Sequence, residues 1–411
     1  MERRDQPRLR PGDLPVMALL FAGSFGLYVF AAASATARAL RPLGALGVYF
    51  DGSYYLEIAR SFPLPFPPEA LSYAGQAPLY PALIWIARGV TPDVWVDWGL
   101  AALLVSWLFA AAVPVAFYAL CRSVGIAPLL PSLLFVFANP RWLPIGSTAH
   151  AEPLAMLFAI LTLLFYLERR LGLCVLMLTL CSLARYPAVL LVVPLALGLV
   201  AERGRHDLRA GLWRDLRELS VFLWPAIAVL AMNVYLFFRI PGFQSIWQAH
   251  GTIWPTGFTW PFASLFEHSA WLWSLSPQTL VVTYWMLALS LLSIGVGLAG
   301  ARGREWALPL WVALLVLFHL SLEGSWALLD VTRLALLAWP ATLLILCRGL
   351  PRLPRALPAG ACAVLAAASL WFVRDNLGWA LLIQQTGRDE QRLQSDEPVF
   401  RTFPSPSPGP R

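Results

Sequence analysis

The sequence predicts an all-α, polytopic membrane protein with about eleven transmembrane helices, each roughly 17 to 25 residues long. Of its 411 residues, 59% are hydrophobic and 13% are charged, whereas soluble domains are about 45 to 50% apolar. Long apolar runs recur between residues 14 and 373. These runs are continuously apolar, which favours helices over the alternating pattern of a barrel. Residues 1–373 are therefore predicted to form one transmembrane domain.

Basic residues mark the predicted cytoplasmic side of the protein. All of them are arginine, and they cluster between the apolar runs at residues 3–10, 169–170, 203–217, 302–304 and 348–355. The positive-inside rule places these clusters in the cytoplasm, with an even number of crossings between each pair. The N-terminus is then cytoplasmic, and the first apolar run is expected to stay as an anchor. Because the net charge of +7 is spread over several loops, it does not indicate a nucleic-acid partner.

Composition also suggests where the protein resides. Lysine is absent, whereas Ala, Leu, Arg and Pro are abundant, a bias that we associate with GC-rich bacterial genomes. We therefore expect a multi-pass protein of a bacterial plasma membrane. The five cysteines lie in or at the ends of apolar runs without the spacing of a zinc site or a disulfide framework, so we interpret them as small core residues.

The first span is predicted at residues 14–36 and ends outside, where a long first outer loop occupies residues 37–97. Within this loop, residues 52–61 have the pattern of an amphipathic helix, and a proline-rich turn follows. Residues 76–90 are apolar on one side and are expected to lie on the membrane interface or to dip into it.

The run of residues 171–200 is too long for one span and too short for two full ones. With Arg185, Tyr186 and Pro187 at its centre, it predicts two short or re-entrant helices that meet near the outer surface. A second long outer loop is expected at 239–277, and a polar, proline-rich outer tail at 374–411. The other crossings are predicted at residues 98–121, 127–139, 153–167, 219–238, 278–299, 306–322, 331–347 and 357–373.

Asp51 is the leading candidate for a catalytic residue, because it places a carboxylate just outside the first span. It could act only as the N-cap of the helix that begins at Gly52. Alternatively, it could act as a general base for an acceptor hydroxyl. Tyr54 and Tyr55 lie three and four residues further on and share its helical face, which resembles the aromatic wall of a sugar site. Glu57 falls on another face and is expected to be solvated or paired with an arginine.

Five ordered pieces of the chain resemble a known family. Residues 50–59 (FDGSYYLEIA) resemble the signature around the first outer acid of bacterial relatives of the phosphatidylinositol-glycan mannosyltransferase V type, which belong to the GT-C superfamily of membrane glycosyltransferases. The others are 77–84 (APLYPALI), 150–154 (HAEPL), 184–187 (ARYP), and 248–250 (QAH) with Trp254 and 260–262 (WPF). Departures from the family pattern at Phe50, His150, Tyr186 and Pro187 leave the sugar and the acceptor open.

The resemblance implies a GT-C-like bundle that performs inverting transfer of mannose or another hexose or pentose. The donor would be a polyprenyl-phosphate sugar, and the acceptor would be a lipid, glycan or protein outside the cytoplasm. Membrane chemistry favours the same arrangement, because nucleotide sugars are not supplied on the outer side, so a lipid-linked donor fits an outward-facing site. The departing phosphate requires arginine, backbone amides or a metal to stabilise its charge.

Arg185 and Arg333 are the candidate phosphate ligands, since both lie near the outer ends of apolar segments. Snorkelling to the interface would explain Arg185 without a substrate, and an ion pair with Asp330 would explain Arg333. His250 and Trp254 could contact the phosphate or the sugar, although an interfacial aromatic belt would also place tryptophans there.

Glu152 could be a favourable helix-start acid, a second acid that positions the acceptor, or the partner of His150. We add Tyr80 to the substrate-binding candidates from its place in the resembling segment. Asp51 and Glu152 are the candidate ligands for a divalent cation such as Mg²⁺ or Mn²⁺, but the sequence near them offers no third ligand. It leaves metal dependence open, as it does oligomeric state.

Two other classes of protein fit part of the pattern. A transporter or flippase would place its ionisable residues near mid-membrane at broken helices and often shows an internal repeat, whereas we find no repeat and the acids lie at the outer boundary. A polymerase or ligase of lipid-linked polysaccharide also uses outer arginines, but the signature around Asp51 does not indicate one.

Overall fold

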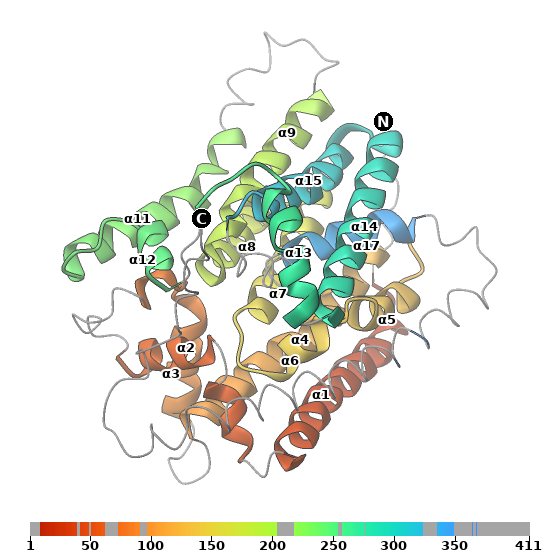
Figure 1. Cartoon of the computed structure of the whole chain (residues 1–411). Coiled ribbons are helices and arrows are strands. Elements are labelled where there is room, and N and C mark those ends of the chain that lie inside the picture. The colour runs from red at the N-terminus through yellow and green to blue at the C-terminus, as the bar shows by residue number, and fades with distance from the viewer. Residues whose placement is uncertain are drawn as a thin grey trace, which may run out of the picture.

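The described part of the chain is all-α, as predicted (Figure 1). Within it, the only strand-like pairing is an isolated antiparallel bridge between Phe258 and Leu322. A computed structural model describes residues 9–38, 42–48, 51–61, 73–90, 97–203, 218–253, 257–275, 277–323 and 335–348, with the single positions 364 and 367. The predicted crossing at 357–373 and the tail at 374–411 therefore lie outside the described residues, apart from those two positions.

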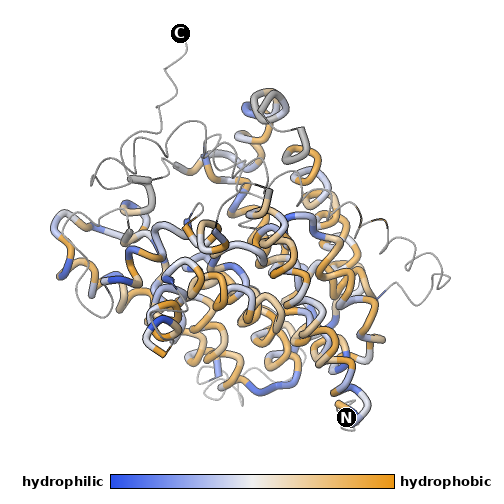
Figure 2. Tube along the Cα trace, turned by 90° about the horizontal axis from the view of Figure 1, so that it is seen from below, coloured by the Kyte–Doolittle hydropathy of each residue, from blue (hydrophilic) through white to orange (hydrophobic). Residues whose placement is uncertain are grey.

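Five helices in the described part are long and apolar enough to cross a membrane. They are residues 13–37 in α1 (Asp13–Arg38), α4 (Trp98–Ser123), residues 218–239, which include α11 (Leu223–Arg239), residues 280–300 in α14 (Pro277–Gly300), and residues 303–320, in which a short 3-10 helix leads into α15 (Ala307–Leu320). Each coincides with a predicted span. Figure 2 shows hydrophobic residues along most of the tube, with hydrophilic ones mainly at turns and helix ends. These features are those of an all-α membrane protein.

Shorter helices occupy five other predicted crossings. They are α5 (Leu129–Phe137), α7 (Glu152–Leu167), α8 (Leu171–Ala184), α9 (Val192–Arg203) and α17 (Trp339–Cys347). Each is shorter than the roughly 20 residues that span a bilayer without distortion. The expected total of about eleven crossings therefore stays a prediction.

Helices α4 and α7 form the centre of the bundle. Helix α4 contacts α1, α5 and α7, and α7 also packs along α8. The largest buried side chains of this core are aromatic. Trp142, in the short helix α6 (Trp142–Ser147), packs edge-on against Phe135 at 5.5 Å between ring centres, and its Nε1 donates to the Tyr28 hydroxyl at 2.8 Å. Helix α6 was not predicted, because its six residues are too few to show a periodic pattern.

The predicted first outer loop contains the expected amphipathic helix at residues 52–61 and contacts α4 through glycines, while its proline-rich turn lies outside the described residues. It contains η1 (Leu43–Val48), α2 (Gly52–Ser61), η2 (Tyr73–Gly75) and α3 (Leu79–Val90). A Cβ atom added to Gly47 would lie 2.2 Å from the carbonyl oxygen of Gly99, at the start of α4. Only glycine permits this contact, so η1 lies directly against α4 and sets the position of α2.

The predicted break in the run 171–200 is confirmed. Helix α8 ends at Ala184, Arg185 is extended with φ −149° and ψ 108°, and the 3-10 helix η3 (Tyr186–Leu191) leads into α9. Pro187 explains the break, because it has no N–H to continue the hydrogen bonds of α8 and its ring would clash with the carbonyl four residues earlier. The guanidinium of Arg185 therefore starts from a point where the chain turns between two helices.

The predicted second long outer loop packs against the end of α15. It contains α12 (Ile246–Ile253) and α13 (Ala263–Leu275). The amide of Thr259 donates to Ser321 at 2.8 Å, and the amide of Glu323 donates to Gly257 at 2.9 Å. The remaining short helices are η4 (Gly303–Trp306), before α15, and η5 (Ala335–Ala338), before α17.

An arginine-rich ion-pair cluster lies at the end of α7 that is opposite Glu152. Glu202 pairs with both Arg169 and Arg304, and Nη1 of Arg304 also donates to the Tyr166 carbonyl at 3.1 Å. Nearby in sequence, Arg348 pairs with Glu305 at 3.0 Å. The described helices therefore gather several predicted cytoplasmic arginines at one end of the α7, α9 and α15 group.

Candidate functional site

Asp51 is buried at the start of α2. Only 3% of Asp51 is exposed. Its backbone carbonyl accepts a hydrogen bond from the amide of Tyr55 at 3.0 Å, which places Asp51 at the N-cap position of α2. Tyr54, Tyr55 and Ile58 are buried on the same helix, as the predicted face requires. Glu57 instead pairs with Arg60 on the exposed side at 2.9 Å. Asp51, Tyr54 and Tyr55 are therefore all on the buried side of α2.

The start of α2 touches the loop that precedes α7. A Cβ atom added to Gly52 would lie 3.4 Å from Cβ of Ala149 and 2.3 Å from the carbonyl oxygen of Gly47. This close approach places Asp51 next to the segment that carries His150 and Glu152. The first outer acid and the second are therefore brought together by packing, although about 100 residues separate them in the sequence.

Tyrosine rings surround this junction. Tyr55 and Tyr80 meet edge to face, with 5.0 Å between ring centres. The Tyr80 hydroxyl donates to the carbonyl of Ala102 at 2.8 Å. Burial raises the pKa of Tyr80 well above its usual value of 10, and the nearby Tyr55 and Glu152 raise it further. Tyr80 is therefore a neutral donor, and two of the predicted substrate residues, Tyr55 and Tyr80, are in direct contact.

Glu152 pairs with Arg185 at the break between α8 and η3. Nη2 of Arg185 donates to Oε1 of Glu152 at 2.5 Å, and the two side chains are 14% and 5% exposed. Glu152 is the first residue of α7, where its charge also favours the helix dipole. Nδ1 of His150 bonds the hydroxyl of Thr148 at 2.7 Å. Of the roles considered for Glu152, the helix-start position is confirmed, and Arg185 is its ion-pair partner.

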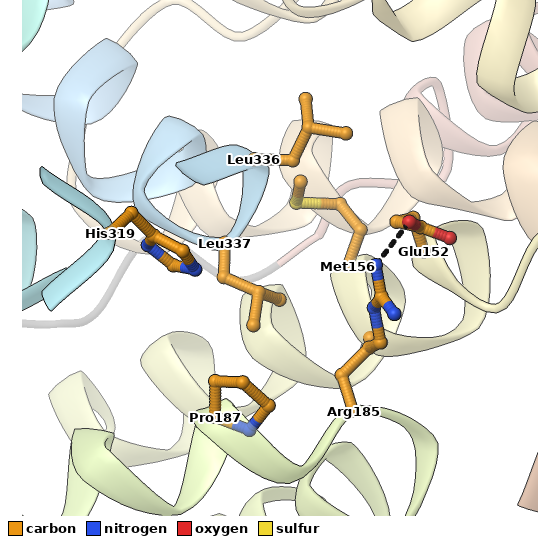
Figure 3. A pocket seen from close by; sticks show the side chains of 8 residues that line it. Glu152, Met156, Arg185, Pro187, His319, Leu336 and Leu337 are labelled. Atoms are coloured by element: carbon orange, nitrogen blue, oxygen red, sulfur yellow. Dashed lines mark hydrogen bonds and ion pairs between the residues drawn. The ribbon is translucent and has the colours of Figure 1, made fainter. Parts of the chain in front are cut away.

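A narrow pocket opens beside this ion pair (Figure 3). Its cavity volume is about 10 Å³, which is room for a single water-sized group. Its lining residues come from α7, from the break at Arg185, from α15 and from η5: Glu152, Ala155, Met156, Arg185, Pro187, His319, Leu336 and Leu337. Asp51 is not among them. The buried Asp51 carboxylate and the pocket are therefore separate features of the region where the start of α2 meets the start of α7.

His319 is the residue that the sequence analysis missed, because a single histidine near the end of an apolar run looks ordinary. It is 1% exposed on the last turn of α15 and faces the pocket opposite the Glu152–Arg185 pair (Figure 3). Its position at the predicted outer boundary, four residues before Glu323, is the only signal in the sequence that could have singled it out.

The predicted second long outer loop reaches the same region. Ala249 of α12 packs with Ala74 of η2 in one small buried cluster. His250 follows in the same helix, although its side chain lies outside the described part. Trp254 and Arg333 lie outside the described residues altogether. Their assignments stay predictions.

The described residues contain no group of three or more His, Cys, Asp or Glu side chains that could hold a metal ion. The candidate ligands Asp51 and Glu152 thus gain no third partner of these types in that part of the chain. Four of the cysteines, Cys121, Cys174, Cys181 and Cys347, are buried without disulfides, as expected for core residues.

No protein-family model matches the chain, and no curated protein matches it.

Proposed function

We propose that the chain is an inverting glycosyltransferase of the GT-C type that uses a polyprenyl-phosphate sugar. The observation that carries the proposal is the junction between two outer loops, where Asp51 is buried against the segment that supplies Glu152 and, through it, Arg185. A buried acid beside aromatic rings and a cation has the three elements that glycosyl transfer from a phosphate requires: a base, a sugar wall and charge stabilisation.

The proposed topology has about eleven crossings, a cytoplasmic N-terminus and an active site outside the plasma membrane of a bacterium. The ion-pair cluster of Arg169, Glu202 and Arg304 supports this orientation, because it lies at the opposite end of α7 from Glu152. A lipid-linked donor fits this arrangement, since its polyprenyl chain would stay in the bilayer while its sugar reaches the junction.

In the proposed reaction, Asp51 accepts the proton of an acceptor hydroxyl. The acceptor oxygen then bonds to the anomeric carbon from the side opposite the phosphate, and the bond from that carbon to the phosphate oxygen breaks. Polyprenyl phosphate leaves with the electron pair, and Arg185, Arg333 and His250 balance its charge. A guanidinium has five N–H donors, so Arg185 can bridge a carboxylate and a phosphate oxygen at once.

The remaining predicted substrate-binding residues, which lie in the predicted outer loops, would orient the sugar and the acceptor. They are Tyr54, Tyr55, Tyr80, His150, Glu152 and Trp254. A divalent cation could assist at Asp51 and Glu152. Activity measured after chelation, and again after adding Mg²⁺ or Mn²⁺, tests that role directly.

The test of the function is transfer by purified protein in liposomes. The donors are polyprenyl-phosphate mannose, glucose, arabinose and galactosamine, and the products are separated as transferred or hydrolysed sugar. Asp51→Asn should lower transfer by roughly 100- to 10,000-fold, the contribution of a general base. Glu57→Gln is the matched control, because Glu57 lies on the exposed side of the same helix. Full transfer by a folded Asp51→Asn variant would rule out the base.

A transporter is the second candidate function, and the broken helix at Arg185 favours it. Transporters commonly form their substrate sites where helices are interrupted, and α8 ends in extended backbone at Arg185. Solute flux into liposomes, together with inactivity toward every donor of the panel, would support this function instead.

A further inference from the structure

His319 has one ring nitrogen in use and one turned toward the pocket. Nδ1 lies 2.7 Å from the carbonyl oxygen of Leu315, one turn earlier in α15. A carbonyl oxygen only accepts hydrogen bonds, so Nδ1 carries the proton. The Nε2 atom of the neutral ring is then an acceptor.

Nε2 is buried, and no described residue forms a hydrogen bond with it. The pocket wall around it is made of Pro187, Leu336 and Leu337, whose side chains have no donor (Figure 3). Buried polar atoms without partners are rare in folded proteins, and each calls for an explanation such as a ligand. The described residues thus supply no hydrogen-bond donor at this point of the pocket.

The chemistry of the pocket selects a neutral hydroxyl for this place. A phosphate would meet the Nε2 lone pair and the Glu152 carboxylate, both of which repel an anion. A hydroxyl can donate to Nε2, while the apolar wall of Pro187, Leu336 and Leu337 covers the adjoining carbon atoms. Because the pocket is narrow, it has room for one hydroxyl group but not for a whole sugar ring.

We propose that the pocket binds a hydroxyl group of the transferred sugar, with Nε2 of His319 as the hydrogen-bond acceptor. This inference rests on the proposed function and assigns to it a residue that recognises the donor sugar. Recognition of one hydroxyl on His319 would make the enzyme discriminate between sugars that carry this group and sugars that lack it.

Two substitutions separate the acceptor from the rest of the side chain. His319→Asn keeps a donor for the Leu315 carbonyl but has no acceptor at the position of Nε2. His319→Gln is long enough to place an oxygen there. For the best donor of the panel, His319→Asn should lower kcat/KM about 3- to 10-fold, mainly through KM, and His319→Gln should restore most of it.

A series of monodeoxy donors identifies the hydroxyl. Wild type should lose about 3- to 10-fold for one deoxy position, and His319→Asn should show no further loss for that same donor. Equal discrimination by wild type and His319→Asn at every position would overturn the inference. Chromatographic behaviour in detergent must match wild type for each variant, and His319→Gln serves as the readout if the asparagine variant does not fold.

A binding measurement that needs no catalysis separates this inference from the proposed function. Protein labelled with ¹⁵N-histidine is titrated with methyl glycosides of the panel sugars, and the His319 resonance is assigned by its loss in His319→Gln. A shift at Nε2 without any transfer activity would refute the glycosyltransferase and leave the sugar pocket standing. Transfer activity with no Nε2 shift for any glycoside would refute the pocket and leave the function standing.

Discussion

Removing the charge of Arg185 should destabilise the protein strongly, because its partner Glu152 is buried. The two side chains are 14% and 5% exposed, and Nη2 and Oε1 are 2.5 Å apart. Breaking a buried pair by removing one partner costs about 3 to 5 kcal/mol, since the other charge stays buried without compensation. Arg185→Met should therefore lower the free energy of unfolding by about 3 to 5 kcal/mol. Glu152→Gln should cost less, because the more exposed guanidinium can turn toward solvent.

The double variant gives the decisive comparison. Glu152→Gln combined with Arg185→Met leaves no buried charge, so its loss should be clearly smaller than the sum of the two single losses. Unfolding is measured in mixed micelles by tryptophan fluorescence, for which the chain offers 19 reporters. The control pair is Glu57 and Arg60, whose side chains are 45% and 50% exposed and whose removal should cost no more than about 0.5 kcal/mol.

Additive losses in the cycle, or single losses below about 1 kcal/mol, would refute this account of the ion pair. The pair would then be solvated in the membrane protein, and Arg185 would be available to a ligand at little cost. Loss of transfer without loss of stability would instead assign Arg185 to the substrate. The cycle thus distinguishes a structural role from a catalytic one.

Two other predictions concern the packing that positions the site. Gly47→Ala should destabilise the protein by about 1 to 3 kcal/mol and impair transfer, because its Cβ would lie 2.2 Å from the Gly99 carbonyl oxygen. Gly89→Ala is the control, since a Cβ atom there would have no atom within 4 Å. Equal stability of the two variants would contradict the proposed contact. Tyr28→Phe should cost about 1 to 3 kcal/mol, since it leaves the buried Nε1–H of Trp142 without its acceptor, and adding Trp142→Phe should cost less than the two changes separately. Unchanged unfolding of Tyr28→Phe would show that water replaces the lost hydroxyl.

Local sequence patterns predicted most of the described helices. The amphipathic helix at 52–61 has the same bounds in the structure, and the break at Arg185 was predicted from the length of the run 171–200 and from Pro187 near its centre. Both signals act over a few residues, as periodicity and proline sterics do. The six-residue α6 was missed, because one and a half turns are too short for a period to be read.

The candidate site was predicted only in part, since its assembly depends on contacts between distant segments. Asp51 and Glu152 were chosen as outer acids, but the sequence offered three explanations for Glu152 and did not single out Arg185 as its partner. His319 was passed over, because nothing near it in the sequence indicates that α15 faces the break between α8 and η3. Such a pairing requires the helices to be packed.

The sequence by itself determined that this is an all-helical membrane protein, where its long apolar helices lie, and that a carboxylate follows the first of them. Those properties depend on composition and on short-range periodicity, which are independent of packing. The tertiary structure alone decided that Gly47, Gly52 and Gly99 let the outer loops approach, that Glu152 holds Arg185, and that His319 joins their pocket. These outcomes follow from close packing between segments far apart in the chain, and no local pattern encodes which helix faces meet.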